Sequence, residues 1–479
     1  MNYSIIFYIL GWICIFQTGF MALPCLVAVI YGEREIIGFL LSMLICLVIG
    51  VPLVLRKPKR QIYYTAESMA TVSLSWIVLS LTGALPFLLT GSIQNPVDAV
   101  FETASGFTTT GASILPEVES LSHCILFWRS FTHWVGGMGV LVFILSLLPL
   151  TGGSHMNLMK AESPGPSVER MLPKVKTTAM ILYQIYFAMT VVQIVVLILA
   201  GMPVFDAFCI AFGTAGTGGF AITNNSLAAY APHLQTITAV FCLLFGVNFN
   251  VYFLLVMKNF RGAFSSEEPR AYFGIVACAV AIITATTASF YHSAGRALHE
   301  AFFQVASIIT TTGFGTTDFD LWPSAPKTVL VLLMLIGACA GSTGGGFKVS
   351  RLVIAMKNAH KEFKLFLHPN MVCKVKMDGK SVDLSVTRSI NIFLVLYVLI
   401  FAVSNLLVSL DGYDLVTNFT AVAATFNNIG PGLAMVGPTQ NFGFFSNFSK
   451  LVLIFDMLAG RLEIFPLMML FYPPTWRKY

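Results

Sequence analysis

Ten long apolar segments run through this 479-residue chain and restrict its fold more than any other feature. They cover residues 5–30, 36–55, 66–90, 122–150, 178–200, 234–257, 271–291, 328–356, 389–409 and 449–472. A helix of about 20 apolar residues crosses the roughly 30 Å hydrocarbon core of a bilayer. Apolar and aromatic residues form 56% of the chain and charged residues only 10%, which argues against a water-soluble fold. Lipid offers no partners to backbone polar groups, so we expect an all-α polytopic membrane protein.

The basic residues predict how this protein is oriented. Of the 28 Lys and Arg residues, 22 are grouped at or after the ends of the second, fourth, sixth, eighth and tenth apolar segments. They lie within residues 56–60, 160–176, 258–270, 348–388 and 477–478. The positive-inside rule places these stretches, and both chain termini, in the cytoplasm. The net charge of +6 is thereby explained without a nucleic-acid partner.

Four short loops that end in glycine fall on the opposite side. They are Thr109-Thr110-Gly111, Thr217-Gly218-Gly219, Thr311-Thr312-Gly313 and Asn428-Ile429-Gly430. At the same distance before each glycine stand Asp98, Asp206, Glu300 and Thr417. A side-chain oxygen at a helix start can accept a free backbone N–H, so we expect these four residues to cap short helices that lead into the loops. Each short helix with its loop is too short to cross the membrane. We therefore expect it to enter the membrane and return to the same side.

The repeated loops predict the domain organisation. Two leading spans occupy residues 1–65. Four units of span, re-entrant helix, glycine loop and span then cover residues 66–176, 177–268, 269–386 and 387–479. Four such units around one axis would form a pseudo-fourfold pore in a single chain.

Glycine loops of this kind suit a dehydrated monovalent cation. A ring of backbone carbonyls can replace its water, and glycine leaves the axis clear and accepts positive φ. The C-terminal end of each short helix adds about half a negative charge. The alternative is that glycine and threonine only let helices pack closely. Four equivalent copies favour the carbonyl filter.

A second glycine-rich segment interrupts the eighth apolar stretch. It contains Gly341, Ser342, Thr343, Gly344, Gly345 and Gly346. Each glycine costs a helix about 1 kcal/mol relative to alanine, so we expect the helix to unwind there. Such a segment can block a pore and move aside, although close helix packing is the alternative. Lys348 and Arg351 would then mark the cytoplasmic exit.

One arginine lies in the middle of the last apolar stretch. Arg461 has Asp456 and Glu463 nearby, and a guanidinium inside a membrane requires a partner or water. We expect it to face the pore, where it would either raise the barrier to cations or stabilise the closed glycine-rich segment by hydrogen bonds to backbone carbonyls. A purely structural ion pair is the competing interpretation.

Six motifs in these regions carry a family resemblance. They are Ser105–Gly111 (SGFTTTG), Gly218–Phe220 (GGF), Thr310–Phe314 (TTTGF), Asn427–Pro431 (NNIGP), Gly341–Lys348 (GSTGGGFK) and Gly460–Ile464 (GRLEI). Over nearly its whole length the chain resembles the Trk/Ktr/HKT superfamily of potassium transporters, most closely the bacterial TrkH-type membrane subunits. In that family four pore glycines accompany potassium selectivity, and segment 341–346 corresponds to the intramembrane gating loop. For the second filter glycine, Gly219 is preferred over Gly218 because it keeps the Gly-Phe pair.

The resemblance implies the protein's setting as well. It implies a homodimer in the bacterial cytoplasmic membrane, docked on a cytosolic ring of TrkA-type nucleotide-binding subunits, with K⁺ as the transported ion bound in the filter. The sequence shows no phosphate-cradling loop or dinucleotide fingerprint, so we expect a transporter and not an enzyme. The alternatives are the potassium-binding subunit of a P-type pump and an ion-coupled secondary transporter such as a symporter.

Overall fold

The computed structural model describes residues 2–58, 65–137, 139 and 175–476, and these are almost entirely helical. Among them the only strands are β1 (Lys376–Met377) and β2 (Lys380–Ser381), an antiparallel pair in which Lys376 faces Ser381. The predicted all-α membrane fold is confirmed.

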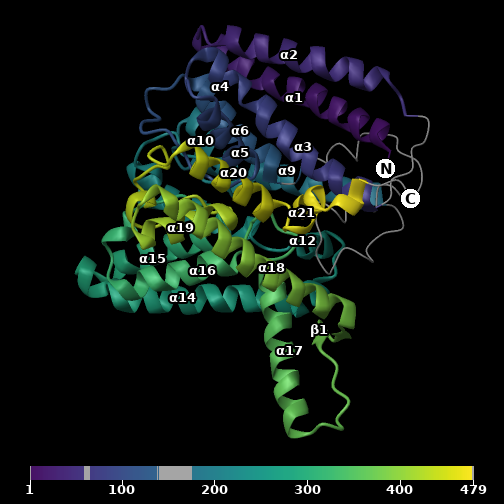
Figure 1. Ribbon diagram of the computed structural model, residues 1–479. Helices are drawn as coiled ribbons and strands as arrows, with labels where there is room; N and C mark the ends of the chain where they lie inside the picture. The colour runs from purple at the N-terminus through teal and green to yellow at the C-terminus, as the bar shows by residue number, and fades with distance from the viewer. Residues whose placement is uncertain (1, 59–64, 138, 140–174, 477–479) are drawn as a thin grey trace.

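Six of the ten predicted spans are continuous apolar helices in the described part of the chain. They are α1 (Tyr3–Tyr31), α2 (Ile36–Leu55), α3 (Thr65–Gly83) continued by α4 (Leu85–Thr90), α9 (Val175–Leu199), α14 (Glu267–Tyr291) and α18 (Leu384–Val408). Figure 1 shows α1 and α2 along one edge of the bundle and α14 along the opposite edge.

The other predicted spans are broken or only partly described. The sixth consists of α11 (Pro232–Phe245) and α12 (Phe249–Val256), which meet at an angle of 87°. The eighth ends early in α16 (Ser324–Ile336), and the tenth divides into α20 (Asn447–Arg461) and α21 (Phe465–Phe471). The fourth begins in α6 (His123–Gly137); its predicted residues 140–150 and most of the basic linker 160–176 lie outside the described residues.

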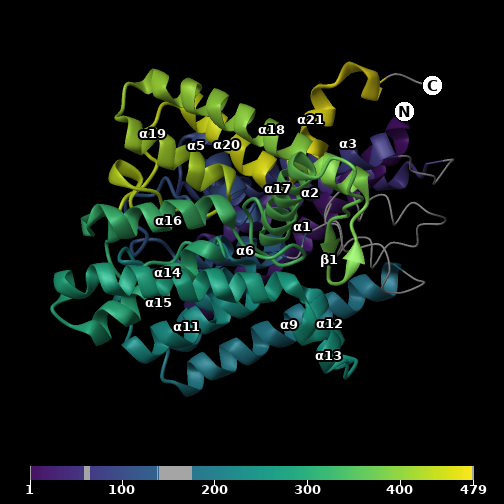
Figure 2. The same ribbon diagram turned by 90° about the horizontal axis from the view of Figure 1, so that it is seen from below.

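Helix α17 (Val349–Leu367) differs from the prediction. The eighth span was expected to continue to residue 356, but the chain turns after the glycine-rich segment and α17 projects from the bundle across the direction of α14 (Figures 1 and 2). Its Lys357, Lys361 and Lys364 recur at helical spacing, which is unfavourable in lipid. This helix therefore does not complete a membrane crossing.

Four short helices precede the glycine loops. They are α5 (Pro96–Phe107), α10 (Val204–Gly216), α15 (Ala294–Ile309) and α19 (Leu415–Phe426). The remaining short elements are α13 (Phe260–Ser265) and the 3₁₀ turns η1 (Ser226–Ala229), η2 (Phe319–Leu321), η3 (Ser409–Asp411), η4 (Ala434–Val436) and η5 (Pro473–Trp476).

The capping residues predicted for these four helices are wrong. Side chains of Asn95, Ser293 and Asp414 cap α5, α15 and α19, while α10 starts after Pro203 without a side-chain cap. The predicted residues lie inside the helices and bond to their surroundings. Asp98 pairs with Lys450 at 2.6 Å, Asp206 accepts from Tyr230 at 2.8 Å, Glu300 accepts from Thr316 at 2.5 Å, and Thr417 donates to Asp414 at 2.5 Å.

The two ends of the chain lie at the same end of the bundle. The ring of Tyr3, at the start of α1, stacks on that of Trp476, at the end of η5, with centroids 6.3 Å apart. This agrees with an even number of crossings.

Candidate ion pathway

The four glycine loops repeat one backbone conformation. Two residues before each glycine, a residue takes a left-handed φ: Thr109 (58°), Thr217 (55°), Thr311 (58°) and Asn428 (55°). The glycines themselves are also left-handed: Gly111 (79°), Gly219 (74°), Gly313 (86°) and Gly430 (97°). Because Gly219 and not Gly218 follows this pattern, Gly219 is the structural equivalent of the other three.

The residue before each glycine closes the end of its helix. Its N–H donates back to a carbonyl five residues earlier, and all four bonds measure 2.8 Å: Thr110 to Ser105, Gly218 to Gly213, Thr312 to Ser307 and Ile429 to Ala424. This is the Schellman ending of an α-helix. It points the C-terminal end of every short helix, with its partial negative charge, at its loop.

The loops meet in a closed ring. A methyl group placed on Gly111 would lie 1.9 Å from the carbonyl oxygen of Gly218 in the second loop. A methyl group on Gly219 would lie 2.0 Å from the Thr312 carbonyl oxygen, one on Gly313 would lie 2.1 Å from that of Ile429, and one on Gly430 would lie 2.8 Å from that of Thr110. Each loop therefore contacts the next and the fourth contacts the first, so the four copies surround one axis.

Side chains in the loops hold this ring. Asn428 donates to the Thr110 hydroxyl at 2.9 Å and to the Met457 carbonyl at 2.9 Å, which joins the fourth loop to the first and to α20. The hydroxyl of Thr312 bonds that of Thr310 at 2.7 Å. All the predicted filter side chains that have a Cβ are completely buried.

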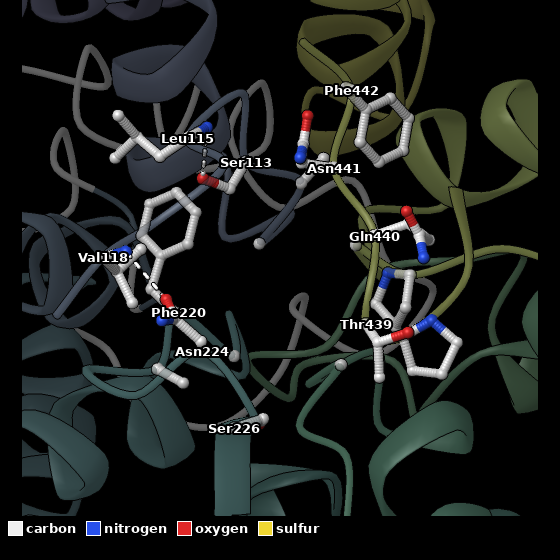
Figure 3. A pocket seen from close by; sticks show the side chains of 18 of the residues that line it. Ser113, Leu115, Val118, Phe220, Asn224, Ser226, Thr439, Gln440, Asn441 and Phe442 are labelled. Carbon is white, nitrogen blue, oxygen red and sulfur yellow. Dashed lines mark hydrogen bonds between the residues drawn. The ribbon is translucent and has the colours of Figure 1, made fainter. Parts of the chain in front are cut away.

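A pocket of about 110 Å³ opens on one side of the ring. The glycines of all four loops line it. In Figure 3, residues from Ser113 to Val118 and from Phe220 to Ser226 lie on one side of it, and Thr439 to Phe442 lie on the other. The pocket therefore adjoins the ring on this side.

Arg129 braces the pocket wall. Its guanidinium pairs with Glu102 at 2.9 Å, lies 4.3 Å from the centre of the Phe220 ring and donates to the Ala221 carbonyl at 3.2 Å. Glu102 in turn accepts from the Ile114 N–H at 3.0 Å. The pair ties α5 and α6 to the segments that follow the first two loops.

The glycine-rich segment, residues 337–348 between α16 and α17, lies against the other side of the ring. The Gly345 N–H donates to the Thr311 hydroxyl at 2.6 Å. Methyl groups on Gly344 and Gly345 would approach the carbonyl oxygens of Thr310 and Asn427 to 2.8 and 2.4 Å. The helix is unwound here as predicted, and the segment covers the third and fourth loops on the side away from the pocket.

Arg461 reaches this segment from the end of α20. It donates to the Thr343 carbonyl at 2.8 Å and to the Gly136 and Gly137 carbonyls of α6 at 2.5 and 2.7 Å. Asp456 accepts from Ser404 at 2.6 Å, and Glu463 pairs with Arg351. The arginine thus joins the middle of the glycine-rich segment to the bundle through backbone oxygens.

Sequence reasoning missed one further polar residue at this segment. Glu268, at the start of α14, accepts hydrogen bonds from Ala340 near the start of the glycine-rich segment and from Ser350, which follows its end in α17. An acidic residue in the first turn of a helix normally complements the helix dipole, so its position gives no signal of a distant partner.

Fold and site together define a polytopic membrane protein with four re-entrant loops closed into a ring within one chain. The chain belongs to the TrkH family of cation transport proteins, whose family model matches residues 36–476. It is 38% identical to the Trk system potassium uptake protein TrkH of Salmonella typhimurium, with both chains fully covered. It is 31% identical to TrkG of Escherichia coli, with 95% of each covered. The crystal structure of the potassium transporter TrkH from Vibrio parahaemolyticus superposes with a TM-score of 0.89 at 33% identity and full coverage of both chains.

Proposed function

We propose that this protein carries potassium into the bacterial cell through the ring of four glycine loops. The closed ring of close approaches between successive loops is the observation that carries the proposal. Only backbone without side chains lines its inner edge at the four glycines, and four helix C-terminal ends are directed at it. This arrangement favours a monovalent cation that has lost its water.

The potassium ion would bind to the carbonyl oxygens of the loops. The residues that contribute are Thr109, Thr110 and Gly111, Thr217, Gly218 and Gly219, Thr311, Thr312 and Gly313, and Asn428, Ile429 and Gly430. A fixed ring of carbonyls replaces the hydration shell at little reorganisation cost when its geometry matches the ion. The names of the relatives, which are potassium uptake proteins, support this choice of ion.

The glycine-rich segment would act as the gate. It lies across the side of the ring that faces away from the pocket, and it is hydrogen-bonded to Thr311 and Arg461. Opening requires these bonds to break and the segment to move away from the third and fourth loops. Because the segment contains four glycines between residues 341 and 346, its backbone can rearrange without large steric penalties.

Control would come from a partner on the cytoplasmic side. The chain has no recognisable nucleotide motif, and its relatives are named as parts of a Trk system. We place it as a homodimer docked on a TrkA-type nucleotide-binding ring in the cytoplasmic membrane, with both termini inside.

Flux measurements in liposomes test the proposed function. The purified protein should pass K⁺ in preference to Na⁺, and the cytosolic partner should change the rate. Single-channel recording separates the mechanisms: discrete openings that carry many ions support a gated pore, whereas strictly coupled turnover would assign alternating access. Uptake that required ATP hydrolysis by a pump subunit would overturn the proposal.

A further inference from the structure

Glu268 is a buried carboxylate whose hydrogen bonds are directed to backbone far away in the sequence. Its side chain lies at the start of α14, and the residue is 5% exposed. One carboxylate oxygen accepts the Ala340 N–H at 2.6 Å and the Ser350 N–H at 3.1 Å. The other accepts the Asn248 side-chain amide at 3.2 Å. Among the described residues it forms no ion pair.

These bonds hold both ends of the glycine-rich segment at one point. Ala340 lies near the start of the segment, and Ser350 is the second residue of α17. The kink between α11 and α12 adds two backbone bonds to the first end: Cys339 N–H to the Gly246 carbonyl at 3.1 Å, and Phe249 N–H to the Gly341 carbonyl at 3.0 Å. The Val349 N–H also donates to the Ala338 carbonyl at 3.0 Å, which joins the two ends directly.

The middle of the segment makes a different set of contacts. The Thr343 carbonyl accepts from Arg461, and the Gly345 N–H donates to Thr311 of the third loop. The Thr343 hydroxyl also donates to the Phe245 carbonyl at the end of α11 at 3.3 Å. The contacts with the ring are therefore confined to the middle, and the ends are fastened to α14 and to the α11–α12 kink. A segment fixed at both ends can move its middle and return to the same place.

We infer that Glu268 is the anchor of the gate: a positioning residue that holds the ends of the glycine-rich segment so that its middle closes under the ring. The inference rests on the gating role proposed above. Its physical basis is that a carboxylate is the acceptor needed by two converging N–H groups, and bonds from N–H to a charged oxygen are stronger than neutral ones. An amide at this position would lose the negative charge that strengthens the two bonds from Ala340 and Ser350 on one oxygen. Its own N–H₂ group would face the Asn248 side-chain amide, which would lose its acceptor.

The first test replaces Glu268 by glutamine. Partner-independent K⁺ flux in liposomes should rise about tenfold in Glu268→Gln, the change expected for the loss of about one charge-assisted hydrogen bond in the closed state. The preference for K⁺ over Na⁺ should not change, because the ring is not touched. The matched control is Glu267→Gln: Glu267 is the adjacent residue and pairs with Lys357 at the surface, and its flux should equal that of the unmodified protein.

A combination with the gate deletion separates this inference from the proposed function. If Glu268 acts through the segment, Glu268→Gln should add no further flux once Gly344–Gly346 are deleted. A multiplicative increase in the deletion background would show that Glu268 acts elsewhere and would overturn the inference. If the deletion alone leaves flux unchanged, the proposed gate fails; if the deletion raises flux and Glu268→Gln does not, only the anchor fails.

Glu268→Asp decides the question if the glutamine variant does not fold. It keeps the charge but shortens the side chain, so the carboxylate cannot reach both N–H groups at bonding distance. A smaller rise in flux than that of the deletion, with an unchanged unfolding temperature, supports the anchor. Flux equal to that of the unmodified protein overturns it.

Discussion

Each filter glycine satisfies two separate requirements of its position. Its φ is left-handed, which costs most residues about 1–2 kcal/mol, and its Cα hydrogen faces a carbonyl of the next loop where no methyl group fits. The first requirement concerns the backbone of one loop. The second concerns the distance between two loops, and this distance sets the size of the ring.

The two requirements can be separated by a pair of substitutions. Gly111→Ser should force the first and second loops apart and reduce the preference for K⁺ over Na⁺, because the shifted carbonyls no longer match the dehydrated K⁺ ion. Gly412→Ser is the control: Gly412 has a similar φ of 80° but nothing within 4 Å of an added methyl group. Competition between K⁺ and Na⁺ in reconstituted protein measures the difference, and equal preference in both variants would remove Gly111 from the ring.

Asp414, the residue that caps α19, gives a pH-dependent prediction. The Thr417 hydroxyl and N–H hold the pKa of this carboxylate below its ordinary value of 3.8. A lowered pKa in the folded state contributes stability that is fully present above the unfolded pKa and is lost as the pH falls through the folded value. Asp414→Ala should therefore destabilise the protein by about 1 kcal/mol near pH 7, and the difference should shrink below about pH 4.

Thermal unfolding in detergent at several pH values checks this prediction. Asp414→Asn is the matched control, since asparagine keeps the capping oxygen without a titrating charge and should show no such pH dependence. A deficit in Asp414→Ala that is the same at pH 7 and pH 3 would contradict the assignment.

At the level of elements, the glycine-rich segment is predicted to control flux without setting selectivity. Deleting Gly344–Gly346 should remove the cover from the third and fourth loops and raise basal K⁺ flux, while the ring carbonyls stay in place. The measurement is flux without the partner, together with K⁺/Na⁺ competition. A folded deletion variant with low, partner-dependent flux would show that the segment only packs helices.

Arg461 should act on the same barrier as the segment. A fixed charge 4 Å from a cation at an effective dielectric of 20 repels it by about 4 kcal/mol, and this guanidinium also bonds the Thr343 carbonyl. Arg461→Ala should raise basal flux. Combined with the deletion, it should give less than the product of the two separate effects; a full product would return Arg461 to a purely structural role.

The sequence predicted the positions of spans and loops along the chain better than the orientations of the helices in space. Apolar length located the spans, and a recurring glycine located the loops, because both depend on local composition. The turn of α17 out of the bundle and the 87° kink between α11 and α12 depend on contacts between distant segments, which hydropathy does not encode. The predicted caps failed for a similar reason: Asp98 and Glu300 recur at one offset, but they bond Lys450 and Thr316 on other segments.

At the level of the whole molecule, the ring divides the protein into two sides that can be labelled separately. The pocket side contains Asn441, and the opposite side contains the exposed Lys374 beside β1. With the basic stretches in the cytoplasm, Asn441→Cys should react with a membrane-impermeant thiol reagent added outside whole cells, and Lys374→Cys should react only after the cells are opened. A background variant without the nine native cysteines is the control, and the reverse labelling pattern would invert the topology.

The ring also has a consequence for how such a pore can change over generations. In a pore assembled from four identical subunits, one codon change alters all four quadrants at once. Here a single gene contains a separate coding stretch for each quadrant. The residue before the glycine is threonine in two quadrants and different in the other two: Thr110, Gly218, Thr312 and Ile429. In the proposed filter a single mutation would therefore modify one quarter of the ion's surroundings, and ion preference would change in small steps.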